Sequence, residues 1–146
     1  MTVERPENMR DYYESNPLMV SSPFGGVENV NGDLLRTVFG ALDIDLADRS
    51  ILDVGCGRGF IGDFVAERGG RYTGVDLVAS RPGAFTLALA DGATLPFPDS
   101  TFDRVFCVDV FEHFPDRPRS VAEFRRVLRP GGQVFLSAPN YGNVAG

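Results

Sequence analysis

The chain has 146 residues, of which 43% are hydrophobic and 23% are charged, as expected for a single globular domain with a substantial core. Its formal net charge is −6, and no run of basic residues occurs anywhere. A nucleic acid or an anionic membrane binds a basic surface, so we expect neither as a partner. All 14 basic residues are arginine, which excludes any chemistry that depends on lysine.

Two cysteines, Cys56 and Cys107, are too few for a disulfide scaffold. The chain does not open with a charged segment followed by an apolar one, as a secretory leader does, and it has no run of about 20 apolar residues. We therefore expect a cytoplasmic protein. No set of metal ligands is predicted.

The first part of the chain, residues 1–49, has the least regular pattern. A polar helical segment is predicted around residues 6–14, followed by a loop. A second helix is predicted from about residue 30 to 42, because apolar residues recur there at three- and four-residue spacing. Its apolar face should cover a sheet; the residues are Leu34, Leu35, Val38, Phe39 and Leu42.

From residue 51 onward, apolar strands alternate with helices. Strands are predicted at residues 51–54, 71–76, 84–90, 103–110 and 133–138, and helices at 60–68 and 116–128. The second helix should place Val121, Phe124, Val127 and Leu128 on one face, and PGG should end it. Residues 77–83 are too few for a helical crossover and are predicted as a loop. This pattern predicts a doubly wound, mainly parallel α/β sheet with helices on both faces.

Acidic residues stand where the predicted strands end, and ligands of such sheets bind beyond the carboxyl ends of the strands. Asp53 and the glycines of GCGRG close the first strand, and Asp76 closes the second. Asp91 follows the third, and Asp109 follows the fourth, ahead of Glu112 and His113. The sequence therefore predicts an acidic cleft beside a glycine-rich turn.

Three ligands suit a strand that ends in a glycine-rich turn: a nucleoside triphosphate, a dinucleotide or a nucleoside without phosphate. The triphosphate motif needs a lysine, which is absent. A dinucleotide stays possible, because GxGxxG occurs at residues 57–62 and Asp76 stands about 20 residues on. Asp53, however, would repel a pyrophosphate by roughly 1 to 4 kcal/mol and attract an ammonium or sulfonium. This pattern favours a ligand with a cationic end.

Five segments together carry a family resemblance: DVGCGRG, GVD, LADGATLPFPDSTFDRV, DVFEHFPD and FRRVLRPGGQVFLSAPN. In this order and spacing, from about residue 51 to 140, the chain resembles the class I S-adenosylmethionine-dependent methyltransferases, in particular the small-molecule branch related to quinone-biosynthesis enzymes. The resemblance implies a Rossmann-like sheet with strand order 3-2-1-4-5. It also implies transfer of a methyl group to a small-molecule acceptor by in-line displacement, without an obligatory side-chain nucleophile.

The resemblance also assigns roles to residues. Asp53 would hold the methionyl ammonium directly or through water, and residues 55–59 would let the methionyl part pass close to the backbone. Asp76 would accept both ribose hydroxyls, and Asp91 the adenine amino group. The cofactor-binding residues expected in this way are Asp53, Gly55, Cys56, Gly57, Gly59, Asp76, Leu77, Asp91, Gly92, Ala93, Val108 and Asp109.

Each of these residues has a purely structural interpretation as well. The glycines could form only a tight turn, Asp76 could cap a helix, and Asp91 could be a turn residue. Cys56 is better explained as a small residue in the turn than as a nucleophile. His113 is the single histidine and a weak catalytic candidate, since its segment also suits capping of the next helix. Tyr12 and Tyr13 could close over a cofactor or lie on the surface.

The end of the chain departs from the family pattern. The sequence stops just after the fifth predicted strand, where the family continues into two further strands that help to shape the acceptor pocket. We therefore expect a helical cap or lid at residues 1–49 and an incomplete cofactor-binding core at residues 50–146, with possible self-association through the edge of the fifth strand. A non-catalytic cofactor-binding module or partner and an NAD-dependent oxidoreductase remain alternatives; Asp53 and the lack of a proton donor other than His113 disfavour the second.

Overall fold

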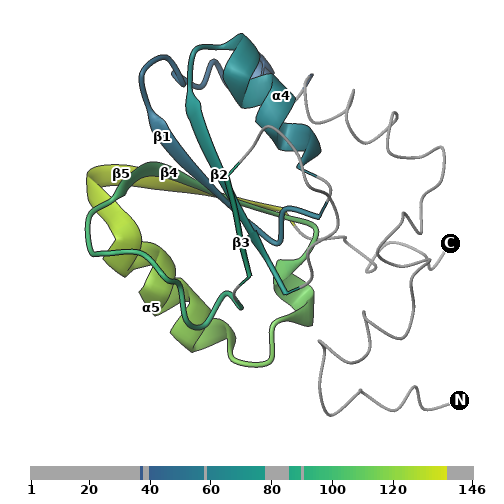
Figure 1. Cartoon of the computed structure of the whole chain (residues 1–146), viewed down its shortest axis with the longest axis vertical. Coiled ribbons are helices and arrows are strands. Elements are labelled where there is room, and N and C mark those ends of the chain that lie inside the picture. Colours follow the sequence, from purple (N-terminus) through teal and green to yellow (C-terminus); the bar gives the residue numbers. More distant parts are fainter. Residues whose placement is uncertain (1–36, 38–39, 58, 78–85, 90, 138–146) are drawn as a thin grey trace, which may run out of the picture.

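A computed structural model describes residues 37, 40–57, 59–77, 86–89 and 91–137 of the chain (Figure 1). Its strands are β1 (Ser50–Val54), β2 (Arg71–Asp76), β3 (Thr86–Leu89), β4 (Phe102–Val108) and β5 (Leu128–Ser137). Its helices are α4 (Phe60–Glu67), α5 (Arg117–Val127) and the short 3-10 helix η1 (Phe111–His113). The strands and helices predicted from residue 51 onward are present, with ends that differ by a few residues.

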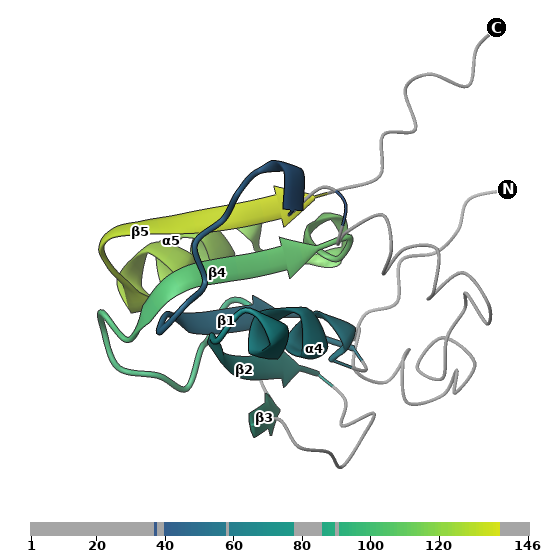
Figure 2. The same cartoon turned by 90° about the horizontal axis from the view of Figure 1, so that it is seen from above.

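The five strands form one sheet in the order β3-β2-β1-β4-β5, and every neighbouring pair is parallel. All strands therefore end at the same edge, as the arrowheads in Figure 2 show. The chain order reverses between β1 and β4, which is the point where doubly wound sheets bind their ligands. The predicted fold class and strand order are confirmed.

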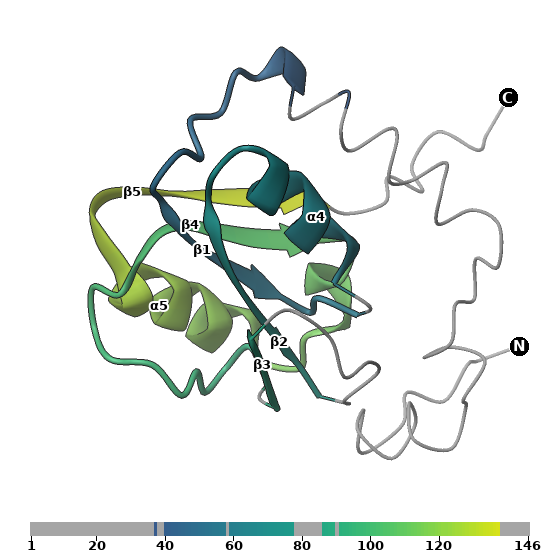
Figure 3. The ribbon, with the colours of Figure 1, turned by 45° about the horizontal axis from the view of Figure 1, so that its top comes forward.

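Helices α4 and α5 lie on opposite faces of the sheet (Figures 1 and 3). The α4 face has a buried cluster of Leu46, Ile51, Ile61, Phe64, Val65 and Phe106. The α5 face has a second cluster of Leu52, Val54, Val75, Leu95, Phe102, Val105, Cys107, Phe124 and Val127. Alternate residues of the central strand β1 thus enter opposite clusters, because successive side chains of a strand point to opposite faces.

The junction of α5 and β5 differs from the sequence prediction. The fifth strand was predicted from residue 133, but β5 begins at Leu128, directly after the helix. Leu128 has φ −77° and ψ 138°, and it pairs with Phe102 before the register shifts and pairing resumes at Gln133. Proline disfavours helical backbone in the residue before it, so Pro130 prevents Arg129 from continuing the helix. The left-handed Gly131, with φ +77°, lies in the irregular stretch between the two paired parts.

Two apolar residues predicted to cover the sheet are instead exposed. Leu42 is 58% exposed and Val121 is 51% exposed, whereas Phe124 and Val127 of the same predicted helical face are buried. Val121 lies in a groove of about 620 Å³ between α5 and β5, together with Val134 and Leu136. The helix thus buries a narrower stripe than its sequence spacing suggested.

Strand β5 lies at an edge of the sheet that the structure describes, with Val134 42% and Leu136 46% exposed. Self-association through this edge stays a prediction. The predicted helix at residues 6–14, most of the helix at 30–42, Tyr12, Tyr13 and nearly all of the loop at 77–83 lie outside the described residues. None of the described helices is both long and apolar enough to cross a bilayer.

Candidate cofactor site

The glycine-rich turn follows β1 and is anchored to β2. The N–H groups of Gly55 and Cys56 both donate to the carbonyl of Val75, at 2.8 and 3.0 Å. Gly55 has φ +76°, and a Cβ there would lie 2.6 Å from Cγ1 of Val110. The fold itself therefore requires glycine at this position, by conformation and by space.

Gly57 occupies a different environment in the same turn. It has φ +52°, but a Cβ added to it would meet no atom of the described residues within 4 Å. In this part of the chain the backbone of the turn can therefore be approached closely at Gly57, as a ligand that passes over it requires. Gly59, with φ +74°, caps the N-terminus of α4 without any side-chain hydrogen bond.

Asp76 connects the end of β2 to this turn. Its Oδ2 accepts a hydrogen bond from the N–H of Gly57 at 2.8 Å, and its Oδ1 accepts one from the N–H of Leu77 at 2.7 Å. A carboxylate oxygen has two lone pairs and can accept more than one hydrogen bond. The carboxylate to which the family resemblance assigns the ribose therefore also fixes the turn.

Asp53 is buried at the base of the turn, only 2% exposed. The Tyr72 hydroxyl donates to its Oδ2 at 2.6 Å. The pKa of Asp53 is raised to about 7, chiefly by burial; the Tyr72 hydrogen bond opposes this rise, and the charge of Asp76 adds to it. Burial and the neighbouring Asp53 carboxyl also raise the pKa of Tyr72, so it remains a hydroxyl donor.

The loop at residues 91–101 follows β3 and begins with the residues predicted to meet adenine. Asp91 is exposed, and its Oδ1 accepts from the N–H of Ala93 at 2.8 Å. Gly92 is buried, and a Cβ there would lie 2.6 Å from the ring of Phe114. The start of this loop is therefore packed directly against the residue that follows η1.

The end of β4 holds the remaining candidates. Val108 is partly buried against the α4-side cluster, and Asp109 is exposed with φ +53°. The hydroxyl of Ser137 donates to Oδ1 of Asp109 at 2.8 Å, which joins the ends of β4 and β5. His113 lies in η1, half exposed, with Nε2 3.5 Å from Oε1 of Glu112.

Both cysteines are buried. Burial is the main cause that raises the pKa of Cys56, and the nearby Asp53 adds to it. Burial likewise raises the pKa of Cys107 to about 12. Neither thiol is in the thiolate form that a nucleophile needs at neutral pH. Among the described residues, no group of three or more histidine, cysteine or acidic side chains is arranged to hold a metal ion.

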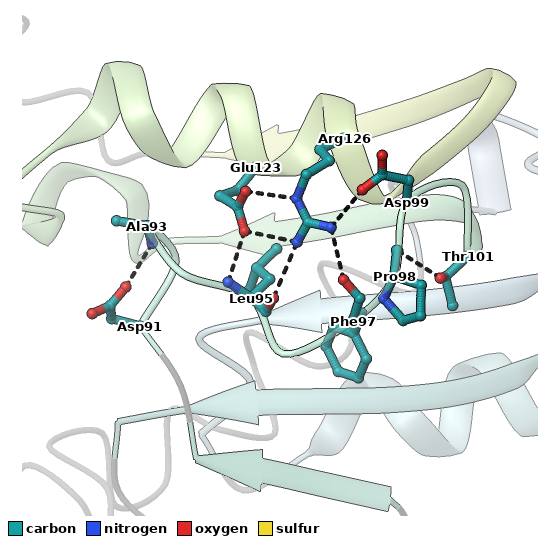
Figure 4. Close-up of polar contacts among 9 residues, drawn as sticks. All are labelled: Asp91, Ala93, Leu95, Phe97, Pro98, Asp99, Thr101, Glu123 and Arg126. Carbon is teal, nitrogen blue, oxygen red and sulfur yellow. Dashed lines mark hydrogen bonds and ion pairs between the residues drawn. The ribbon is translucent and has the colours of Figure 1, made fainter.

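Sequence reasoning missed two contributions to the site. Tyr72 was interpreted only as a strand residue, although its hydroxyl is bonded to Asp53. Glu123 and Arg126 were interpreted only as part of a helix, yet they hold the loop at residues 91–101 (Figure 4). Their spacing of three residues on a helix indicates an ion pair, but no sequence signal shows that backbone groups elsewhere bind to it.

The described geometry suits a ligand with a cationic end and hydroxyl groups. The carboxyl ends of the parallel strands lie at one edge of the sheet (Figure 2), and four carboxylates belong to these ends. Asp53 and Asp76 lie in the last two residues of β1 and β2, and Asp91 and Asp109 lie in the segments after β3 and β4. Opposite charge stabilises an ammonium or sulfonium there, and carboxylates form charge-assisted hydrogen bonds with hydroxyls. No atom of the described residues would meet a Cβ at Gly57 within 4 Å.

Comparisons with known proteins agree with this geometry. A family model described as a methyltransferase domain matches residues 52–136. The ubiquinone biosynthesis O-methyltransferase of Pseudomonas paraeruginosa is 35% identical over 107 residues, which cover 65% of this chain and 46% of that protein. The chain thus spans about half the length of the curated relatives it matches.

Solved structures also resemble the chain. The complex between the Haloferax volcanii Trm112 methyltransferase activator and a putative methyltransferase contains a chain with TM-score 0.70 and 20% identity, covering 86% of this chain and 57% of that one. An S-adenosylmethionine-dependent methyltransferase from Mesorhizobium loti has TM-score 0.58 and 25% identity, covering 66% of this chain and 49% of that one. The first of these likenesses shows the shared fold.

Proposed function

The chain belongs to the methyltransferase domain family, whose cofactor is S-adenosyl-L-methionine, and on this basis we propose that it transfers the cofactor's methyl group to a small-molecule acceptor. The observation that carries the proposal is the position of Asp76. Its carboxylate accepts from the N–H groups of Gly57 and Leu77, which holds it at the end of β2 beside the glycine turn, where the ribose of the cofactor would bind.

The first half of the cofactor would bind at the ends of β1 and β2. Asp76 would accept the two ribose hydroxyls, and residues 55–59 would let the methionyl part pass over the backbone at Gly57. Asp53 would hold the ammonium through Oδ1 or through a water molecule, since Oδ2 already accepts from Tyr72. Cys56 and Gly59 complete the turn.

The adenine would bind against the loop that follows β3. Asp91 would accept its amino group, Leu77 would lie against the ring, and Gly92 and Ala93 would offer backbone groups. Val108 and Asp109 would line the cleft where the sulfonium lies. His113 is left without a catalytic role in this proposal, because its contact is with Glu112 beside it.

S-adenosylmethionine supplies an electrophilic methyl group on a sulfonium. The chain's own residues have to hold the donor in line with the acceptor, and alignment of this kind is worth up to roughly 7 to 11 kcal/mol of a reaction barrier. No described side chain needs to act as a covalent nucleophile. The acid-rich strand ends serve this purpose by fixing the ammonium and the ribose.

The acceptor is a matter of inference from relatives. They carry the description ubiquinone biosynthesis O-methyltransferase, which favours an oxygen acceptor on a small molecule, and we expect the reaction to take place in the cytoplasm. Because the chain matches about half the length of these relatives, a second candidate is a module that binds the cofactor without turnover. The helical lid proposed for residues 1–49 belongs with the first candidate.

A thermal-shift experiment tests the cofactor. S-adenosylhomocysteine and S-adenosylmethionine should raise the melting temperature, because a ligand that binds only the folded state stabilises it, and NAD should not. Stabilisation by NAD alone would refute the proposal and favour the oxidoreductase. Saturable binding of S-adenosylmethionine without methyl transfer to any phenolic acceptor would support the non-catalytic module.

A further inference from the structure

The loop at residues 91–101 has no helix or strand of its own, although it begins with the residues proposed to recognise adenine. Its internal hydrogen bonds are short-range. Asp91 Oδ1 accepts from the Ala93 N–H, and the Thr101 hydroxyl donates to the Pro98 carbonyl at 2.7 Å. These contacts shape its two ends but do not attach the loop to the rest of the protein.

The end of the loop is attached to the end of α5 by backbone bonds, from the N–H groups of Ser100 and Thr101 to the carbonyls of Arg126 and Val127. Its middle is attached by two side chains of α5, a pair we call the Glu123–Arg126 clamp (Figure 4). The Arg126 guanidinium donates to the carbonyls of Leu95 at 3.1 Å and Phe97 at 2.8 Å, and to Oδ1 of Asp99 at 2.9 Å. Glu123 Oε2 accepts from the N–H of Leu95 at 2.8 Å. Both backbone groups of Leu95 are therefore bound by the clamp.

The clamp is itself rigidly paired. The Arg126 Nε and Nη2 atoms donate to Oε1 and Oε2 of Glu123 at 2.7 and 2.9 Å, a bidentate geometry that fixes both side chains. The pKa of Glu123 is lowered to about 2, chiefly by the hydrogen bond from Arg126; partial burial opposes this shift, and the Leu95 N–H adds to it. The pair is consequently charged at neutral pH.

The part of the loop that the clamp holds begins at Leu95, next to residues 91–93, the proposed adenine end. Leu95 is only two residues beyond Ala93, and its side chain is 4% exposed in the α5-side core. On the other side, the Phe114 ring leaves no room for a Cβ at Gly92. The turn at residues 91–93 is therefore bracketed by a packed ring and by the clamp, and a shift of Leu95 would move it.

We propose that Glu123 and Arg126 are positioning residues that set how strongly the site prefers adenine over other purines, by holding the loop at residues 91–101 in the binding conformation. This inference rests on the proposed function, because it takes residues 91–93 as the adenine end. A structural role alone would lower the stability of the fold and the affinity for every ligand alike. A positioning role would also reduce the preference for the adenine amino group.

The test compares S-adenosylhomocysteine with S-inosylhomocysteine, in which an oxygen replaces that amino group. Isothermal titration calorimetry would measure both dissociation constants for the wild type, Arg126→Gln, Arg126→Lys and Glu123→Gln. The preference for the adenosyl ligand should fall roughly fivefold or more in Arg126→Gln, the equivalent of one hydrogen bond. Arg126→Lys should recover part of it, since lysine keeps the charge but not the fork of donors.

Arg125→Gln is the matched control, because Arg125 is the neighbouring exposed arginine on α5. Its side chain has no hydrogen bond or ion pair among the described residues. It should keep the wild-type preference. If Arg126→Gln does not fold, Glu123→Gln carries the test, with a smaller fall in the same ratio. An unchanged ratio in the folded variants would overturn the clamp proposal while leaving the proposed function intact. A wild type that binds neither ligand would overturn the proposed function and the clamp with it.

Discussion

At the ends of β1 and β2, the candidate site is held by the strands themselves: Gly55 and Cys56 donate to Val75, and Asp76 binds the turn across the strand pair. At the loop after β3, the corresponding support comes from α5, about 30 residues farther along the chain, through Arg126 and Glu123. The first half is thus part of the fold, whereas the middle of the loop in the second half is attached by side chains, with backbone bonds from Ser100 and Thr101 at the loop's end. Substitutions in the first half should therefore affect folding as well as binding.

The largest effect is expected for Gly55→Ala. Alanine at φ +76° costs about 1 to 2 kcal/mol, and its Cβ would lie 2.6 Å from the rather rigid Val110 side chain, which adds roughly 1 to 3 kcal/mol. The free energy of unfolding, measured by urea denaturation, should fall by about 2 to 5 kcal/mol.

The double variant Gly55→Ala with Val110→Ala separates the two causes. It should recover the steric part of the loss and keep the conformational part, which a double-mutant cycle would show as coupling between the two sites. A loss of less than about 1 kcal/mol in Gly55→Ala would mean that the turn rearranges freely. The stability of the fold would then depend no more on the first half of the site than on the loop after β3.

The second effect concerns pH and Asp53. Its pKa is about 7 in the folded protein, well above the 3.8 of an ordinary aspartate. Between these two pH values the folded state therefore binds more protons than the unfolded state. The stabilising contribution is fully present below about pH 4 and is lost as the pH rises through 7. Between pH 5 and pH 7, the free energy of unfolding should fall by about 2 kcal/mol from this group.

The variant Asp53→Asn is compared with the wild type. The asparagine amide oxygen can still accept from the Tyr72 hydroxyl, but the amide does not titrate. The variant should lack this decline in urea denaturation series at pH 5, 6 and 7. A ligand ammonium favours the ionised carboxylate, so the wild type should also bind S-adenosylhomocysteine more tightly at pH 8 than at pH 6, and Asp53→Asn should not. The same decline in both proteins would show that Asp53 is not its source.

A third prediction compares one carboxylate from each half. Asp76→Ala should weaken binding of S-adenosylhomocysteine by at least about tenfold, because it removes charge-assisted hydrogen bonds worth roughly 1.5 to 3 kcal/mol each. It should also lower stability, because Asp76 binds Gly57 and Leu77. Asp91→Ala should weaken binding with little change in stability. Asp91 is exposed, and its side chain accepts only from the Ala93 N–H among the described contacts.

His113→Ala is the control for both, and calorimetry with thermal melts provides the measurements. It should leave the dissociation constant nearly unchanged, because His113 is half exposed and pairs with Glu112. If His113→Ala weakened binding more than Asp76→Ala, the cofactor would have to be placed near η1 instead. Equal losses of stability in the two aspartate variants would remove the contrast between the halves.

The same contrast explains what the sequence could predict. The glycine turn, Asp53 and Asp76 are close in sequence to the strand ends that position them, so the pattern DVGCGRG followed by GVD indicates their arrangement. Tyr72 depends on the register that pairs it with Ile51, which no local pattern specifies. Glu123 and Arg126 bind backbone groups of a distant loop, and backbone groups carry no sequence signal. The start of β5 at Leu128, ahead of the predicted residue 133, depends on pairing with Phe102 across a register shift, which no local pattern specifies.

The smallest effect on stability is expected for Gly57→Ala, and it tests whether the turn meets a ligand at all. Alanine there would meet no atom of the described residues within 4 Å, so its φ of +52° should be the main cost, at about 1 kcal/mol. If the methionyl part of the cofactor passes over this backbone, the added methyl group occupies its path, and S-adenosylhomocysteine should bind at least about tenfold more weakly in calorimetry. Because the expected loss of stability is small, weak binding by Gly57→Ala would not be explained by unfolding of the variant. The same cannot be said of Gly55→Ala, which is expected to be much less stable. Near-normal affinity would show that the turn serves the fold alone, and the ligand would have to lie farther from β1, toward the loop after β3.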